Sequence, residues 1–168
     1  MPISKTLLKK LNESKIKHEI VNHRKVFTAL DVAATLKVKL EQVVKSLLIK
    51  ADKDFYLALL PANKNLDLKK LAKALGIPLK KISIPKEKIM TTKFKVKPGA
   101  MSAFGSIYKL PLIVDKSLIK VRDGIFSSGS FIESFRMKIK DYLKFEKPLE
   151  GNFSVAKKIK KSKTNKKK

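Results

Sequence analysis

Hydrophobic positions near the start of the chain follow the spacing of helices. The leucines within residues 7–11 recur on one helix face, and Ser4 is a suitable N-cap for that helix. Thr28 followed three residues later by Asp31 is typical of a capping box, which indicates the start of a second helix. The sequence therefore predicts two amphipathic helices before the first long apolar run.

Longer apolar runs predict strands. A strand beginning near Lys45 (SLLIK) and the run FYLALLP at 55–61 predict a hairpin, and 67–75 is an amphipathic helix that ends at Gly76. Further predicted elements are a strand at 81–84, a helical turn at 85–90, a glycine-punctuated loop region at 91–109, a strand at 110–114, a strand pair at 124–130 and 134–139, and a helical turn at 141–145. This interleaving predicts a mixed α/β fold with much antiparallel pairing.

The chain is strongly basic, and its end is the most basic part. Of 168 residues, 40 are lysine or arginine and 14 are aspartate or glutamate, which gives a net charge of +26. Residues 157–168 hold eight of the lysines and no acid. Such a block buries too little apolar surface to fold, so we expect one domain over residues 1–156 and a disordered tail over 157–168. The charge favours nucleic acid as partner ahead of an anionic membrane surface.

Composition and motifs exclude several kinds of chemistry. There is no cysteine and there are two histidines, which excludes thiol nucleophiles and makes a metal centre improbable, and we predict no cofactor. The sequence has neither a G-x-S-x-G elbow nor a G-x-x-x-x-G-K-[ST] phosphate loop. Because it also lacks a signal-peptide pattern and any run of membrane-spanning length, we expect a cytoplasmic protein without membrane association.

Two features remain as candidates for a site. Lys45 lies in the apolar segment VVKSLLIK, where a lysine marks either a sheet edge or a cation held at a site. The loop KPGAMSAFG at 97–105 has two glycines and small residues, so its backbone N–H groups can be reached by a ligand unless it is an ordinary turn.

Six segments follow one another along the chain: VFTALDVAA (26–34), EQVVKSLLIK (41–50), LALLPANKNLDLKKLAKALG (57–76), PGAMSAFG (98–105), LPLIVDKSL (110–118) and FSSGS (126–130). In this order they resemble the YbaK and prolyl-tRNA-synthetase editing-domain family of trans-acting aminoacyl-tRNA deacylases. The resemblance implies a single α/β (α+β) domain with a mixed, largely antiparallel sheet flanked by helices. It also implies hydrolysis of the ester of mischarged tRNA, and an aminoacyl-tRNA synthetase as a possible partner.

The resemblance also implies site residues. The family's lysine corresponds to Lys45 and its G-x-x-x-P loop to 99–103, where Ala103 stands in place of proline; His18 stands where the family often has tyrosine. Catalysis is thereby assigned to Lys45 and Gly99. The substrate contacts implied are His18, His23, Phe27, Thr28, Ala100, Met101, Ser102, Ala103, Phe104, Gly105, Ser128 and Gly129, and the contacts to the tRNA from the tail are Lys157, Lys158, Lys160 and Lys161.

The implied mechanism needs no strong nucleophile, because an aminoacyl ester is already activated. N–H groups of 99–103 would stabilise the carbonyl oxygen, and Lys45 would anchor the terminal phosphate and ribose. Water, or a hydroxyl or thiol of the substrate, would attack. Two alternatives stay open: a non-catalytic RNA-binding module with the same fold, which the alanine at position 103 favours, and a basic protein that compacts nucleic acid.

Overall fold

The predicted hairpin is the centre of the largest sheet. The computed structural model describes residues 5–26, 28–96 and 101–156. Its sheets are a five-stranded one in the order β5 (Ile82–Ser83), β2 (Val44–Ala51), β3 (Asp54–Pro61), β6 (Leu112–Asp115), β9 (Leu149–Gly151); a three-stranded one in the order β1 (Glu19–Asn22), β8 (Glu133–Lys138), β7 (Asp123–Ser127); and a ribbon of β10 (Ser154–Ala156) with β4 (Lys64–Leu66). Pairing is antiparallel except for β3–β6 and β6–β9, which confirms a mixed, largely antiparallel fold.

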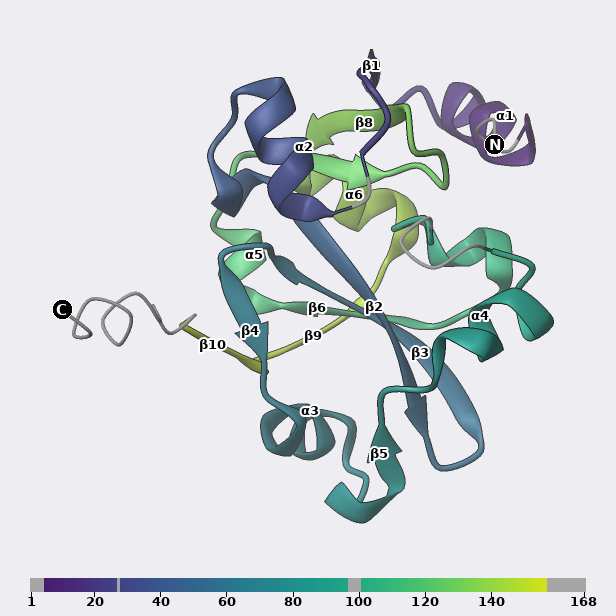
Figure 1. Cartoon of the computed structure of the whole chain (residues 1–168), viewed down its shortest axis with the longest axis vertical. Helices are drawn as coiled ribbons and strands as arrows, with labels where there is room; N and C mark the ends of the chain where they lie inside the picture. Colours follow the sequence, from purple (N-terminus) through teal and green to yellow (C-terminus); the bar gives the residue numbers. More distant parts are fainter. Residues whose placement is uncertain (1–4, 27, 97–100, 157–168) are drawn as a thin grey trace, which may run out of the picture.

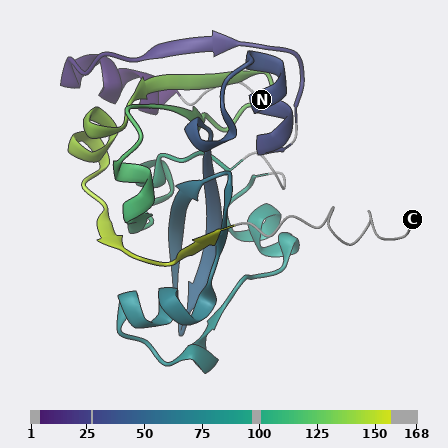
Figure 2. The ribbon, with the colours of Figure 1, turned by 90° about the vertical axis from the view of Figure 1, so that its left-hand side faces the viewer.

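Helices flank these sheets (Figures 1 and 2). They are α1 (Lys5–Ser14), α2 (Ala29–Leu36), α3 (Leu68–Leu75), α4 (Glu87–Lys93), α5 (Lys116–Ile119) and α6 (Ile139–Glu146), with the short 3-10 helices η1 (Leu40–Gln42), η2 (Leu79–Lys81) and η3 (Gly105–Tyr108). Figure 2 shows the three-stranded sheet with α1 at one end of the molecule and α3 at the other, with the β2–β3 hairpin running between them.

Local end signals placed two helices correctly. The Asp67 side chain accepts hydrogen bonds from the N–H groups of Lys69 and Lys70 at 2.9 and 3.1 Å, and Gly76 ends α3 with a φ of 70°. The Thr28 side chain likewise accepts the N–H of Asp31 at 3.1 Å, which fixes the start of α2. Both helices were predicted because their caps are neighbours in the sequence.

Other elements differ from the sequence-based expectation. The helical turn expected at 85–90 is α4, which runs on to Lys93, and η3 forms within the segment expected to be a loop. The strands β1, β4, β9 and β10 and the helix α5 were not predicted. These strands have three or four residues each, and each pairs with a strand far away in the chain, so they carry little local signal. The predicted tail lies outside the described residues.

The β2–β3 hairpin separates two apolar cores. On one face, Val44 and Leu48 of β2 pack in a core that also holds Phe104 and Tyr142. On the other face, Ile49 packs in a core that holds buried residues of α3. Because successive side chains of a strand point to opposite faces, Lys45 and Ser46 at the start of β2 belong to different faces.

Asp115 ties the C-terminal strands to the large sheet. Its carboxylate accepts the N–H groups of Phe153 and Ser154 at 2.7 and 2.9 Å, the Ser154 hydroxyl, and both the N–H and the hydroxyl of Ser117. Burial raises the pKa of Asp115, but these hydrogen bonds outweigh it, so the pKa lies below that of an ordinary aspartate. The ionised carboxylate is therefore part of the fold.

Replacing this carboxylate should destabilise the protein in a pH-dependent way. Asp115→Asn should lower the free energy of unfolding by about 2 kcal/mol at pH 7, because an amide cannot accept all these donors. Since the folded pKa is depressed, the stabilisation is present above the ordinary aspartate pKa and is lost as pH falls through the folded pKa. Urea titrations across this acid range measure the loss. Asp52→Asn, at an exposed position, is the control. If the difference in the free energy of unfolding between the wild type and Asp115→Asn were the same at every pH, the assignment would be contradicted.

Candidate functional site

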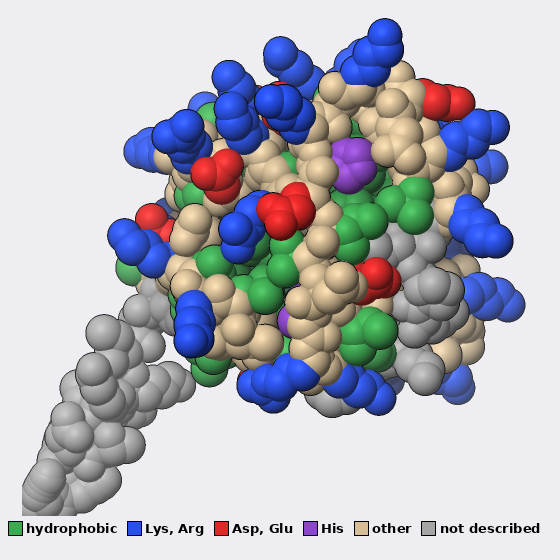
Figure 3. All heavy atoms as spheres, turned by 90° about the horizontal axis from the view of Figure 1, so that it is seen from above, with side chains coloured by type: hydrophobic (Ala, Val, Ile, Leu, Met, Phe, Trp, Pro, Cys, Tyr) green, Lys and Arg blue, Asp and Glu red, His purple; other side chains and the backbone are tan. Residues whose placement is uncertain are grey.

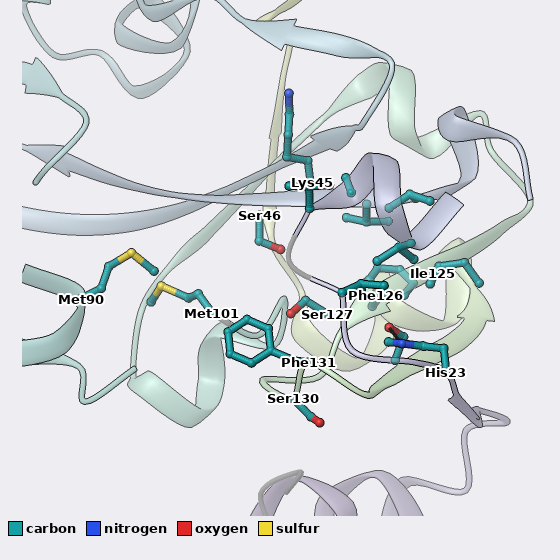
Figure 4. Close-up of a pocket in the computed structure, with 17 residues that line it drawn as sticks. His23, Lys45, Ser46, Met90, Met101, Ile125, Phe126, Ser127, Ser130 and Phe131 are labelled. Carbon is teal, nitrogen blue, oxygen red and sulfur yellow. Dashed lines mark hydrogen bonds between the residues drawn. The ribbon is translucent and has the colours of Figure 1, made fainter. Parts of the chain in front are cut away.

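A pocket of about 200 Å³ lies beside the start of β2. Its polar lining comes from β2, β7, β8 and the segments before α2 and β8: His23, Thr28, Lys45, Ser46, Ser127, Ser130 and Ser134. Apolar side chains complete it, among them Val26, Met90, Met101 and Phe131. We call it the serine-lined pocket (Figure 4). Four of the lining residues were predicted site residues: His23, Thr28, Lys45 and Met101. Ser46 was not predicted.

Lys45 and Ser46 leave β2 in opposite directions (Figure 4). The Lys45 ammonium donates a hydrogen bond to the carbonyl of Lys64 in β4 at 2.9 Å, which holds the cation on the β4 side of the sheet. The Ser46 hydroxyl points toward the side of Ser127. It is buried and has no hydrogen-bond partner among the described residues, which marks it as a group that a ligand can satisfy.

His23 is joined to Ser134 at the pocket wall. Its Nδ1 lies 2.8 Å from the Arg24 carbonyl oxygen and its Nε2 lies 2.9 Å from the Ser134 hydroxyl. A carbonyl oxygen only accepts, so in the neutral ring Nδ1 carries the proton and Nε2 accepts the hydrogen of Ser134. The pair connects the end of β1 with β8, and it presents an imidazole and a hydroxyl to the pocket.

The described part of the predicted loop uses its N–H groups inside the protein. The N–H of Ser102 donates to the Tyr108 hydroxyl at 2.8 Å, that of Ala103 to the Ser127 carbonyl at 2.9 Å, and that of Phe104 to the Ser102 hydroxyl at 3.2 Å. These N–H groups therefore cannot stabilise a carbonyl oxygen of a substrate in this arrangement. The other residues of the expected loop are Met101, which lines the serine-lined pocket, and Gly99 and Ala100, which lie outside the described residues.

The backbone N–H of Ala103 donates a hydrogen bond that holds the loop against β7. A proline there, which the family pattern has, cannot donate to the Ser127 carbonyl. We expect Ala103→Pro to lower the free energy of unfolding by about 1 to 3 kcal/mol in chemical denaturation. Ala103→Gly keeps the donor and should cost at most about 1 kcal/mol. A proline variant as stable as the wild type would show that this hydrogen bond contributes nothing.

Several other predicted substrate contacts are not brought to the pocket. Ser102, Ala103, Phe104 and Gly105 are buried in or beside the core. The Phe104 ring packs against four neighbouring aromatic rings, and a Cβ on Gly105 would meet Leu112 Cγ at 2.9 Å, so the size of each residue is fixed by packing.

The remaining predicted contacts serve local structure or lie outside the description. His18 Nδ1 lies 2.9 Å from the Ile16 carbonyl oxygen, and its ring meets Phe135 edge to face. The Ser128 hydroxyl donates to the Glu133 carbonyl, and Gly129 adopts a φ of 95° in the turn between β7 and β8. Outside the described residues lie Phe27, Gly99, Ala100, Lys157, Lys158, Lys160 and Lys161.

Sequence reasoning missed part of the polar lining. Ser46 could have been found, because strand alternation places it on the face opposite Lys45. Ser130 and Ser134 carried no comparable signal, since they reach the pocket through the pairing of β8 with β1 and β7. The pocket is thus assembled largely by strand pairs that are distant in sequence.

Positive charge surrounds these elements. Figure 3 shows lysine and arginine side chains at the rim of one face, with apolar side chains between them. Within the described ranges, no three or more His, Asp or Glu side chains gather as a metal site would need. No helix in the same ranges has the length and apolar character needed to cross a bilayer.

The fold matches solved structures at low sequence identity. A hypothetical protein superposes with a TM-score of 0.81 at 14% identity, over 90% of this chain and 100% of its own. A protein described as "a putative trans-editing enzyme for prolyl tRNA synthetase" gives 0.78 at 20% identity, over 92% and 100%. A protein from Marinobacter aquaeolei VT8, described as acting in signal transduction, gives 0.67 at 15%, over 92% and 31%. These likenesses establish the fold.

The family follows from the sequence itself. The profile of the aminoacyl-tRNA editing domain matches residues 23–145. The chain belongs to this family. No curated protein matches it. The matched range runs from His23 past Ser134, so it contains every residue that lines the serine-lined pocket of this editing domain.

Proposed function

We propose that this editing domain is a trans-acting aminoacyl-tRNA deacylase that hydrolyses the ester of mischarged tRNA. The observation that carries the proposal is the serine-lined pocket, which lies wholly within the family match and combines Lys45, a histidine–serine pair and the buried hydroxyl of Ser46. The 3′ end of an aminoacyl-tRNA carries a phosphate, a ribose and the amino group of the attached amino acid close together. The pocket offers hydrogen-bonding groups for these parts, and Lys45 at its edge supplies a cation, which in this structure donates to the Lys64 carbonyl on the β4 side of the sheet.

Hydrolysis at this site requires positioning more than a strong nucleophile. Water attacks the carbonyl carbon of the ester, the bond to the ribose oxygen breaks, and that oxygen takes a proton. We assign the anchoring of the terminal phosphate and ribose to Lys45, and contact with the aminoacyl group to His23, Thr28 and Met101, which line the pocket. Stabilisation of the carbonyl oxygen is assigned to Gly99, because the N–H groups of Ser102 and Ala103 are engaged elsewhere.

The size of the pocket favours a small amino acid. About 200 Å³ is below the range of sites for drug-sized ligands, so we expect the pocket to admit a small side chain and to exclude an aromatic one. The orphan hydroxyl of Ser46 offers a hydrogen bond to a polar group on that amino acid. The expected cellular partners are aminoacyl-tRNA and, through it, a synthetase.

Release of amino acid from mischarged tRNA tests the proposal. The purified full chain is mixed with tRNA carrying one of several small amino acids, and ester loss is followed against the buffer rate. We expect accelerated loss for at least one small amino acid and none for phenylalanine. Hydrolysis at the buffer rate for the whole panel would contradict the proposal.

A non-catalytic RNA-binding module is the second candidate. The engaged N–H groups of Ser102 and Ala103 favour it, because they remove two donors that a catalytic loop would use. Under this alternative the protein binds tRNA with its positive charge and leaves the ester intact. Measuring binding beside hydrolysis in the same samples separates the two candidates.

A further inference from the structure

A second depression, of about 380 Å³, lies at the other end of the β2–β3 hairpin. It is lined by three lysines and several aromatic rings, and we call it the aromatic–lysine pocket: Lys53, Phe55, Lys93, Phe94, Tyr108 and Lys109. No residue of this set was predicted from the sequence to belong to a site. The set comes from the hairpin turn, the end of α4 and the end of η3.

The aromatic rings form a half-buried cluster. The Phe94 ring centroid lies 5.5 Å from that of Phe55 and 6.2 Å from that of Tyr108, both edge to face. All three side chains are partly accessible rather than buried. The Lys93 ammonium lies 5.4 Å from the centroid of the Phe55 ring. Rings and cations are therefore interleaved at one place on the surface.

The charge of this pocket suits a nucleic-acid strand. Lys53, Lys93 and Lys109 are exposed, and Asp54 is the single acid in the lining. Exposed lysines attract phosphates without reading sequence, and aromatic faces or edges give bases a surface to pack on. The combination is typical of sites for single-stranded nucleic acid, whose bases are free to stack.

One segment of the chain, residues 90–108, contributes side chains to both pockets. Met90 of α4 lines the serine-lined pocket, and Phe94 lines the aromatic–lysine pocket four residues later, a rise of about 6 Å along a helix. The Ser102 N–H, next to Met101 of the first pocket, donates to the hydroxyl of Tyr108 in the second at 2.8 Å. A single-stranded 3′ end that occupies both pockets would have to follow this segment from one to the other.

We propose that the aromatic–lysine pocket binds the unpaired nucleotides that precede the terminal adenosine of a tRNA 3′ end. This inference rests on the proposed function, because it supposes that the terminal adenosine and its aminoacyl group occupy the serine-lined pocket. The lysines contact the phosphates of these nucleotides, and the ring of Phe94 packs against a base. The contact supplies affinity for the 3′ end and takes no part in the reaction.

The inference is tested by measuring the binding of a labelled single-stranded RNA oligonucleotide that ends in CCA. Fluorescence anisotropy gives its affinity over a series of salt concentrations. The triple variant Lys53→Gln, Lys93→Gln, Lys109→Gln should bind at least about tenfold more weakly and lower the salt slope by about 2, for three lost single-strand contacts. The control carries the same change at Lys69, Lys70 and Lys73, exposed residues of α3. It should stay within about twofold of the wild type.

Replacing the aromatic ring of Phe94 tests the inference independently of the lysines. Phe94→Leu should weaken binding about tenfold with an unchanged salt slope, whereas Phe145→Leu, which removes a half-buried ring outside the pocket, should not. In deacylation, the lysine triple variant should raise KM for an aminoacyl minihelix and leave both its kcat and the hydrolysis of aminoacyl-adenosine unchanged.

The outcomes separate this inference from the proposed function. Equal RNA affinity and salt slope for the pocket triple variant and the α3 control would overturn the inference, even if the wild type hydrolyses its substrate. The expected binding differences without hydrolysis of any ester would support an RNA site here and contradict the deacylase proposal alone.

Discussion

Replacing Lys45 with methionine is expected to lower kcat/KM for the hydrolysis of a mischarged tRNA by about 100- to 1000-fold. The variant keeps most of the apolar stem and removes the ammonium, which we propose fixes the terminal phosphate and ribose. It also removes the hydrogen bond to the Lys64 carbonyl, worth about 1 kcal/mol of folding stability. Initial rates with the full chain measure the effect, and a denaturation curve shows that the variant is folded in the assay.

Lys50→Met provides the matched control for this prediction. Lys50 belongs to the same strand but is exposed and lies outside the serine-lined pocket, so its loss should change kcat/KM by no more than about threefold if global charge is unimportant. If Lys45→Met hydrolysed the substrate at the wild-type rate, the assignment of Lys45 to the anchoring of the substrate would be contradicted. A variant that fails to fold would instead assign the lysine to the junction between β2 and β4.

The elements that could be predicted from the sequence are those whose start, end or partner is marked by residues nearby in the chain. Helix α3 was predicted nearly to the residue, because Asp67 is a local start signal and Gly76 a local stop signal. The hairpin was predicted because β2 and β3 are long and joined by a short turn. In contrast, β9 and β10 are held by Asp115 and by strands far away in the chain, which no local pattern reports.

The same distinction applies to the site. Lys45 was found as a cation in an apolar segment, and it does line the pocket. The loop residues Ser102 and Ala103 were expected to offer N–H groups to a ligand, but small residues can also mark tight packing, and here Tyr108 and the Ser127 carbonyl take those donors. Sequence alone does not distinguish a loop that faces a ligand from one that faces the core.

Removing residues 157–168 is expected to weaken tRNA binding for every tRNA tested. The segment carries eight lysines, which contact phosphates without reading bases. If three to six of them engage, the slope of log K against log salt should fall by roughly two to five for the 1–156 chain. The rate at saturating substrate should be unchanged, because none of the proposed chemistry uses these residues.

A full-length variant with the eight lysines changed to glutamine separates charge from length. It should bind tRNA as weakly as the 1–156 chain and show the same reduced salt slope, because the proposed contacts are electrostatic. Salt slopes identical to that of the wild type would show that the lysines do not contact RNA. The affinity for tRNA would then come from the described domain, whose own lysine and arginine residues still outnumber its acids by a wide margin.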